Sequence, residues 1–155
     1  YEPEAEPGEV DGVIASPTCR PWAIANVGRS GLDDPRGQLI HVPLRWVLAL
    51  RPRWTAWEIT PLALPVFEQH AITLCAAGYD VATGLLRAER FGVASTRTRA
   101  VLVGRLDGPA RLPPPPHDVP VSMAQVRGWD GAELVSNDGT SGDPRNRGRR
   151  AMDHG

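Results

Sequence analysis

The order of elements along the chain is the feature that most constrains its fold. Two apolar or β-branched runs are each followed by a stretch in which apolar residues recur every three or four positions, and two more apolar runs come later. The expected strands cover residues 10–15, 54–60, 79–86 and 100–104. Strands that alternate with helices form mostly parallel sheets. The sequence therefore predicts an α/β fold whose sheet is mostly parallel and ends in a hairpin-like antiparallel pair.

Two helices are expected between the strands. The first begins with Asp34 as N-cap and Pro35 at the first helical position, and it runs to about Leu50. Its expected buried stripe is Leu39, Ile40, Pro43, Val47 and Leu50, with a kink at Pro43. The second helix ends at Gly78, and its expected buried stripe is Leu64, Phe67, Ala71, Leu74 and Cys75. Cys75 is therefore assigned to the core.

Composition excludes several classes of protein. The net charge of −1 over 155 residues lacks the basic excess of a nucleic-acid-binding domain, and every basic residue is an arginine. Two cysteines far apart form no disulfide framework or zinc pattern, so a reduced, intracellular protein is expected. The sequence has no long apolar run, and no basic stretch precedes an apolar one, so we expect neither a transmembrane helix, a signal peptide nor a membrane partner. The chain begins with Tyr1, not Met, and is expected to be a piece of a longer protein.

The character of the sequence changes after residue 108. A proline-rich connector covers residues 112–117, and one short helix is expected within residues 121–129. Residues 137–155 are polar, rich in glycine and arginine, and without periodicity, so an irregular C-terminal tail is expected. We therefore divide the chain into residues 1–108, which can form a packed domain, and residues 109–155.

Cys19 is the first candidate for chemistry. It follows the strand expected at residues 10–15 and precedes a polar, glycine-containing stretch, and open α/β sheets bind ligands at the carboxyl ends of their strands. A free cysteine is most often a small buried hydrophobe. The turn-forming neighbours of Cys19, and Arg20, which favours the thiolate, indicate a nucleophile instead.

Glu58 is the second candidate, because it is the only charged residue in the strand expected at residues 54–60. A carboxylate is costly to bury unless it is paired or useful. In the simpler alternative the strand ends there and Glu58 meets water or an arginine. The carboxyl ends of neighbouring parallel strands lie on one rim, about 4.8 Å apart. A thiol and a carboxyl on that rim can address one small planar substrate.

Arg97 and Arg99 are the third candidate. Their spacing places both guanidinium groups on one face of an extended segment. The simpler alternative is a solvated edge. In the functional interpretation the pair supplies fixed hydrogen-bond donors to a phosphate or a carbonyl oxygen.

These features, in this order, resemble the DNA (cytosine-5-) methyltransferase family. The family's Pro-Pro-Cys-Gln-Pro-Phe-Ser motif is similar to residues 17–23, and its Asp-Pro-Arg-Gly-x-Leu motif to residues 34–39. Its Glu-Asn-Val motif is similar to residues 58–60, and its Asn-Ala-x-x-Tyr-Gly-Val-Pro-Gln-x-Arg-x-Arg motif to residues 87–99. The chain departs from these motifs at Thr18, Arg20, Ile59, Ala94 and Ser95. The resemblance covers residues 10–104.

The resemblance implies a fold, a reaction and a partner. The fold is the later half of a Rossmann-like, S-adenosylmethionine-dependent methyltransferase sheet, and the partner is double-stranded DNA. Cys19 would add to carbon 6 of a flipped cytosine, while Glu58 binds ring nitrogen 3 and the exocyclic amine. Arg99 would hold the ring carbonyl, and Arg97 would support the loop or a phosphate. The loop at residues 20–32 would close over the base.

The resemblance also implies a cofactor, S-adenosyl-L-methionine, with Thr18 and Leu39 as cofactor-binding residues. The family binds this cofactor at a Phe-x-Gly-x-Gly turn, which does not occur in the sequence. We therefore expect the isolated chain to show no measurable methyl transfer. It is expected to be either an inactive remnant or one half of a split enzyme that needs a second chain. In the domain division above, residues 1–108 then become a partial catalytic domain, and residues 109–155 lead into the target-recognition region.

A cysteine hydrolase is the remaining class of enzyme to consider. It would need a histidine base for Cys19. The chain offers His41, His70, His117 and His154, but none of them lies at the end of an expected strand. The sequence therefore disfavours this reading.

Overall fold

The computed structural model describes residues 3–22, 31–116 and 122–128 of the chain. Its strands are β1 (Gly12–Ala15), β2 (Trp54–Ile59), β3 (Asp80–Arg87) and β4 (Thr98–Arg105). Its α-helices are α1 (Val42–Leu50), α2 (Leu64–Ala76) and the short α3 (Met123–Arg127). Five 3-10 helices connect them: η1 (Arg20–Trp22), η2 (Gly31–Asp33), η3 (Gly37–His41), η4 (Pro61–Ala63) and η5 (Ala88–Phe91). The expected irregular tail and most of the expected closing loop lie outside the described residues.

The four strands form one sheet in the order β1-β2-β4-β3. β1 runs parallel to β2, and β4 is antiparallel to both of its neighbours, so three strands share one direction and β4 opposes them. β3 and β4 form the hairpin-like pair. The predicted α/β fold, with a mostly parallel sheet and one antiparallel strand, is confirmed.

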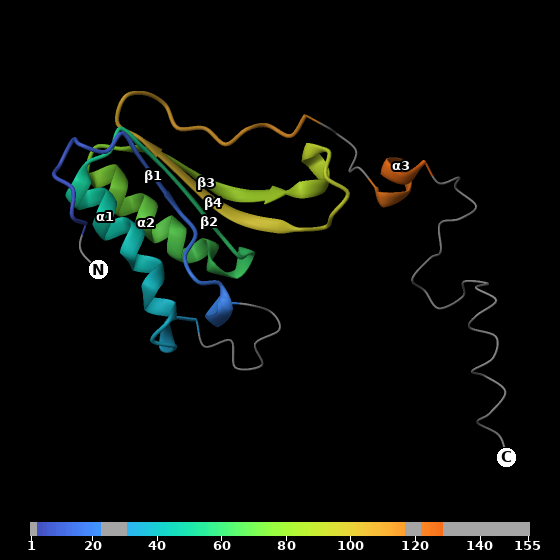
Figure 1. Cartoon of the computed structure of the whole chain (residues 1–155), viewed down its shortest axis with the longest axis horizontal. Helices are drawn as coiled ribbons and strands as arrows, with labels where there is room; N and C mark the ends of the chain where they lie inside the picture. Colours follow the sequence, from blue (N-terminus) through green and yellow to red (C-terminus); the bar gives the residue numbers. More distant parts are fainter. Residues whose placement is uncertain (1–2, 23–30, 117–121, 129–155) are drawn as a thin grey trace, which may run out of the picture.

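One face of the sheet packs against α1 and α2, which lie side by side along it (Figure 1). Side chains alternate along β2, and Thr55, Trp57 and Ile59 are buried on this face. Leu102 of β4 and Phe67 of α2 belong to the same core. Burial of these apolar side chains is the main source of stability for the two layers.

The opposite face carries Glu58 and is covered differently. The register pairs Glu58 with Val101 of β4, and Val101 with Gly84 of β3. A Cβ atom added to Gly84 would lie 2.8 Å from Leu112 Cδ1. The proline-rich segment after β4 therefore runs back across this face (Figure 1). Its backbone is anchored where Ala110 N donates to Asp80 Oδ2, at 3.0 Å.

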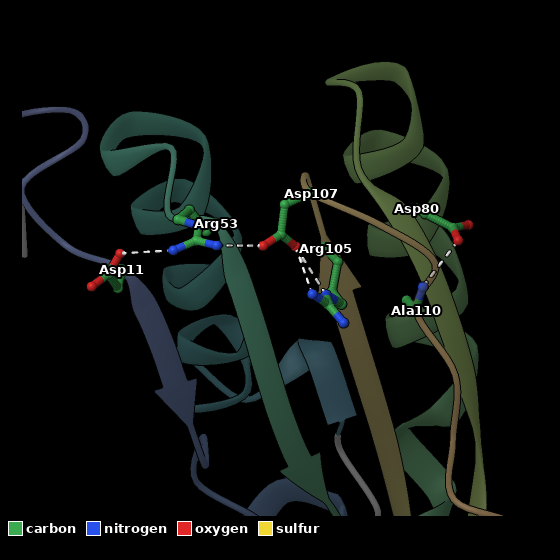
Figure 2. Close-up of polar contacts among 6 residues, drawn as sticks. All are labelled: Asp11, Arg53, Asp80, Arg105, Asp107 and Ala110. Atoms are coloured by element: carbon green, nitrogen blue, oxygen red, sulfur yellow. Dashed lines mark hydrogen bonds and ion pairs between the residues drawn. The ribbon is translucent and has the colours of Figure 1, made fainter.

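Ion pairs tie the strands together at the end of the sheet where β1 and β2 begin (Figure 2). Arg53 lies 2.9 Å from Asp107 and 3.8 Å from Asp11, and Arg105 also pairs with Asp107. The guanidinium groups of Arg105 and Arg53 hold the pKa of Asp107 below its usual range. This polar end lies opposite the carboxyl ends of β1 and β2, where the candidate site was predicted.

The start of the first helix differs from the prediction. Asp34 does not cap a helix: its carboxylate accepts from Arg36 N at 2.8 Å and pairs with the Arg36 guanidinium, which lowers the Asp34 pKa to about 2. The chain then forms η3, and α1 begins only at Val42. Pro43 lies in the first turn, where its missing N–H needs no partner, so it starts the helix instead of kinking it.

Two residues assigned to buried stripes are exposed. Leu39 is 40% exposed because η3 turns it away from the core. Cys75 is also exposed, since the buried side of α2 carries Phe67, His70 and Leu74. The assignment of Cys75 to the core is therefore wrong. No helix in the described part of the chain is long and apolar enough to cross a membrane.

Candidate functional site

The carboxyl ends of β1 and β2 lie side by side. These strands pair in parallel register, with Ala15 opposite Trp57. One step further along each strand places Ser16 beside Glu58. Cys19 follows three residues later, is exposed, and immediately precedes η1. The structure therefore brings the Cys19 segment and Glu58 to the same edge of the sheet.

Glu58 is the centre of a polar cluster on the face of the sheet that α1 and α2 leave uncovered. Its Oε1 atom lies 2.5 Å from Nε of Arg99 and 4.0 Å from a terminal nitrogen of Arg97. Its Oε2 atom accepts a hydrogen bond from the Ser16 hydroxyl at 3.0 Å. Glu58 is 39% exposed, Arg99 26% and Arg97 62%. A half-buried carboxylate with two arginines and a hydroxyl can offer both donors and acceptors to a planar, polar ligand.

The two arginines differ in how firmly they are held. Arg99 lies inside β4, not before it as predicted, and a terminal nitrogen donates to the Thr98 carbonyl at 2.7 Å. Arg97 precedes the strand, and its backbone N–H donates to Ser95 Oγ at 3.3 Å. Arg99 therefore has a fixed orientation, whereas the exposed side chain of Arg97 retains freedom to move.

An apolar groove of about 960 Å³ follows the free edge of β1 toward this cluster. One wall is β1 and the residues after it, including Ser16 and Thr18. The other wall comes from η3 and α1: Leu39, Val42, Pro43, Trp46 and Leu50. The two residues that the resemblance assigns to the cofactor, Thr18 and Leu39, thus face the same groove from opposite walls.

The fit of this groove to S-adenosyl-L-methionine is partial. Its apolar lining suits one face of a purine ring, and Ser16 and Thr18 add two hydroxyl groups. The lining contains neither a glycine-rich turn nor an arginine, and its one acidic residue is Glu4. The described residues would therefore supply only part of a cofactor site.

Sequence reasoning missed Ser16. Its contact with Glu58 joins residues 42 positions apart, and a serine before a turn carries no signal of its own. The register of β1 against β2, which only the structure shows, reveals the contact, since two side chains at the same level of neighbouring parallel strands point to the same face.

The histidines of the described part lie elsewhere. His41 Nδ1 and His70 Nε2 are 2.8 Å apart, in a hydrogen-bonded pair that joins η3 to α2. Burial, and then the charge of His41, lowers the pKa of His70 to about 4. The two rings thus bind each other, and neither of them is placed to act as a base for Cys19. His117 and His154 lie outside the described residues.

Comparison with known proteins identifies the family. The sequence profile of C-5 cytosine-specific DNA methylases matches residues 2–127. The chain belongs to the C-5 cytosine-specific DNA methylase family. The resemblance inferred from the motifs is therefore confirmed.

The related sequences and structures agree with this assignment. The type II methyltransferase M.NgoPII of Neisseria gonorrhoeae is 32% identical over 103 residues, which are 63% of this chain and 30% of the relative. M.XorII of Xanthomonas oryzae pv. oryzae is 31% identical over 125 residues, 76% of this chain and 28% of the relative. This chain spans less than a third of the length of either relative.

Among solved structures, the methyltransferase EhMeth of Entamoeba histolytica superimposes with a TM-score of 0.54 and 20% identity. The match covers 83% of this chain and 39% of EhMeth. The Dnmt2 methyltransferase of S. pombe gives a TM-score of 0.50 and 21% identity, with coverage of 67% and 31%. Both comparisons support the fold of a C-5 methylase.

Proposed function

We propose that this chain carries the nucleophile and the base-binding residues of a DNA cytosine-5 methyltransferase that acts on double-stranded DNA. One observation supports the proposal above all. Glu58, Arg97 and Arg99 come together beside the end of β1, four residues before Cys19. These are the residue types that recognition and activation of a cytosine ring require, in the motif order of the family.

In the proposed reaction the Cys19 thiolate adds to carbon 6 of a cytosine that has left the base stack. The addition makes carbon 5 nucleophilic. Glu58, with a shared proton, bonds ring nitrogen 3 and the exocyclic amine, and Arg99 donates to the ring carbonyl. Arg97 contacts a phosphate or the loop. After methylation, loss of the carbon 5 proton expels Cys19 and restores the aromatic ring.

The proposed cofactor is S-adenosyl-L-methionine, which supplies an electrophilic methyl group when bound. Thr18 and Leu39 would line its site from the two walls of the groove. Because the described residues supply only part of this site, the remaining contacts have to come from another segment or another chain. What this chain contributes is the orientation of the base and the attacking sulfur.

The free edge of β1 is the proposed place for that complementary part. Within the described part of the chain β1 pairs with β2 on one side only, Ile14 is 78% exposed, and the groove beside α1 is apolar. A second chain that supplies the cofactor-binding half would extend the sheet here by strand pairing. The alternative is a catalytically inactive remnant that acts as a DNA-binding or interaction module.

The proposal extends to the organisation and setting of the protein. Residues 1–108 would form the partial catalytic domain, and residues 109–155 the connector and the start of a target-recognition region. M.NgoPII and M.XorII are bacterial type II methyltransferases. By analogy we place this chain in a restriction–modification setting, in the cytoplasm with the nucleoid of a bacterium or encoded by a phage.

Transfer of a labelled methyl group from S-adenosyl-L-methionine to duplex DNA tests the proposal. We expect no incorporation with the isolated chain. Incorporation that disappears in Cys19→Ser would support the reaction but contradict the need for a complementary part. Incorporation that survives Cys19→Ser would contradict the proposed chemistry.

A further inference from the structure

The two oxygens of Glu58 have different partners. Oε1 faces the arginines, at 2.5 Å from Arg99 and 4.0 Å from Arg97. Oε2 faces the opposite way and accepts from the Ser16 hydroxyl at 3.0 Å. The carboxyl group therefore binds a neutral donor on the β1 side through Oε2 and faces cationic donors on the β4 side through Oε1.

This arrangement is not the one that charge alone would favour. A carboxylate beside guanidinium groups gains most when both of its oxygens accept from them, in a bidentate pair. The Arg97 side chain is 62% exposed, and the 4.0 Å between its terminal nitrogen and Glu58 Oε1 is too long for a hydrogen bond. The side chain can therefore move, and it would gain a charge-assisted hydrogen bond by binding Oε2. A carboxyl group held in that way would turn both of its oxygens toward the arginines and leave neither on the β1 side.

The Ser16 hydroxyl works against this bidentate pair, because its hydrogen bond keeps Oε2 on the β1 side. The parallel register of β1 and β2 fixes Ser16 at the level of Glu58, on the same face of the sheet. A hydroxyl can donate to a carboxylate or accept from a protonated carboxyl, whereas a guanidinium can only donate. Ser16 can therefore hold Oε2 in either protonation state of Glu58.

We propose that Ser16 is a positioning residue that keeps Oε2 of Glu58 away from Arg97 and directed toward the place of the substrate base. The functional part of this inference rests on the proposed role of Glu58 in cytosine recognition. The positioning part rests only on the contacts of Ser16, Glu58 and the two arginines.

Hydrogen exchange of the arginine side-chain N–H groups, followed by NMR on the full chain, tests the positioning. Ser16→Val and Ser16→Thr form a matched pair, because they have the same shape and differ only in the hydroxyl. In Ser16→Val the released Oε2 should pair with Arg97 and slow exchange of its side-chain protons about threefold. Ser16→Thr should match the wild type. Equal exchange of Arg97 in the two variants would overturn the proposal, and Ser16→Ala provides the same comparison with a smaller side chain.

Base discrimination tests the functional consequence. The probe is a duplex with cytosine or thymine opposite an abasic site, which makes the target base easy to extrude. The preference for cytosine is the Kd for the thymine duplex divided by the Kd for the cytosine duplex. We expect this ratio to fall about fivefold in Ser16→Val but not in Ser16→Thr. An unchanged preference in Ser16→Val would contradict the functional part. If not even the wild type prefers cytosine, the proposed role of Glu58 fails, and the exchange result still decides whether Ser16 positions its carboxyl group.

Discussion

His70 makes the stability of the fold sensitive to mild acid. The ring is 3% exposed, lies against Trp57 and Phe67, and shares a hydrogen bond with His41. Among the described residues, its Nδ1 atom has no partner. The neutral tautomer that donates from Nε2 to His41 leaves only an acceptor unsatisfied, whereas a protonated ring would bury an unpaired donor and a charge.

The direction and size of the effect follow from the His70 pKa. It lies at about 4 in the folded chain, below the ordinary value of 6.5. The unfolded chain therefore binds the proton first as the pH falls, and stability is lost below about pH 6.5, down to the folded pKa. The full shift corresponds to about 3 kcal/mol, of which about 2 kcal/mol is lost between pH 7 and pH 5. This loss is large against a typical unfolding free energy of about 5–15 kcal/mol.

Urea unfolding at pH 7, 6 and 5, followed by tryptophan fluorescence, measures this loss. Buried Trp57 contacts His70 and reports on the same core. The control is His70→Gln, whose amide can still donate to His41 but does not titrate, and we expect it to lose less than about 0.5 kcal/mol over this range. An equal loss in the wild type and in His70→Gln would refute the reasoning. So would an unfolding free energy in the wild type that does not change with pH.

Two further predictions concern the thiols and the core. Native protein should react with two equivalents of a thiol reagent, and Cys19→Ser with one, because Cys19 and Cys75 are both exposed; a single reactive thiol in the wild type would contradict the placement of Cys75. Thr55→Val should lower the unfolding free energy by about 2 kcal/mol, because Thr55 Oγ1 is the acceptor for the buried Trp57 Nε1. The same change at exposed Thr73 is the control, and a similar loss at both positions would refute the contribution of the buried hydrogen bond.

The strands and their directions could be predicted from sequence because their signals are local. Alternating helical and β-branched runs specify a mostly parallel sheet, and each expected strand forms within a few residues of its predicted bounds. The start of α1 could not be predicted in this way. Asp34-Pro35 has the pattern of a helix start, but the Asp34 carboxylate accepts a hydrogen bond from Arg36 in a local turn. The helix α1 begins later, at Val42, with Pro43 in its first turn.

The candidate site was predictable in part, because the strands that carry it have local sequence signals. Placing Glu58 on a common rim required only that β1 and β2 be parallel neighbours. The hydrogen bond of Ser16 depends on the exact register, which the sequence does not specify. The exposure of Cys75 depends on which side of α2 faces the sheet, and buried His70, a polar residue, defines that side.

Covalent trapping by a complete enzyme tests the central claim most directly. In a chimera, residues 10–104 of this chain would replace the matching segment of M.NgoPII, which supplies the parts that this chain does not span. With S-adenosyl-L-methionine and a duplex that contains 5-fluorocytosine, the chimera should form a stable protein–DNA adduct at Cys19, and Cys19→Ser should form none. A folded chimera that binds the duplex without forming an adduct, or an adduct that survives Cys19→Ser, would contradict the account.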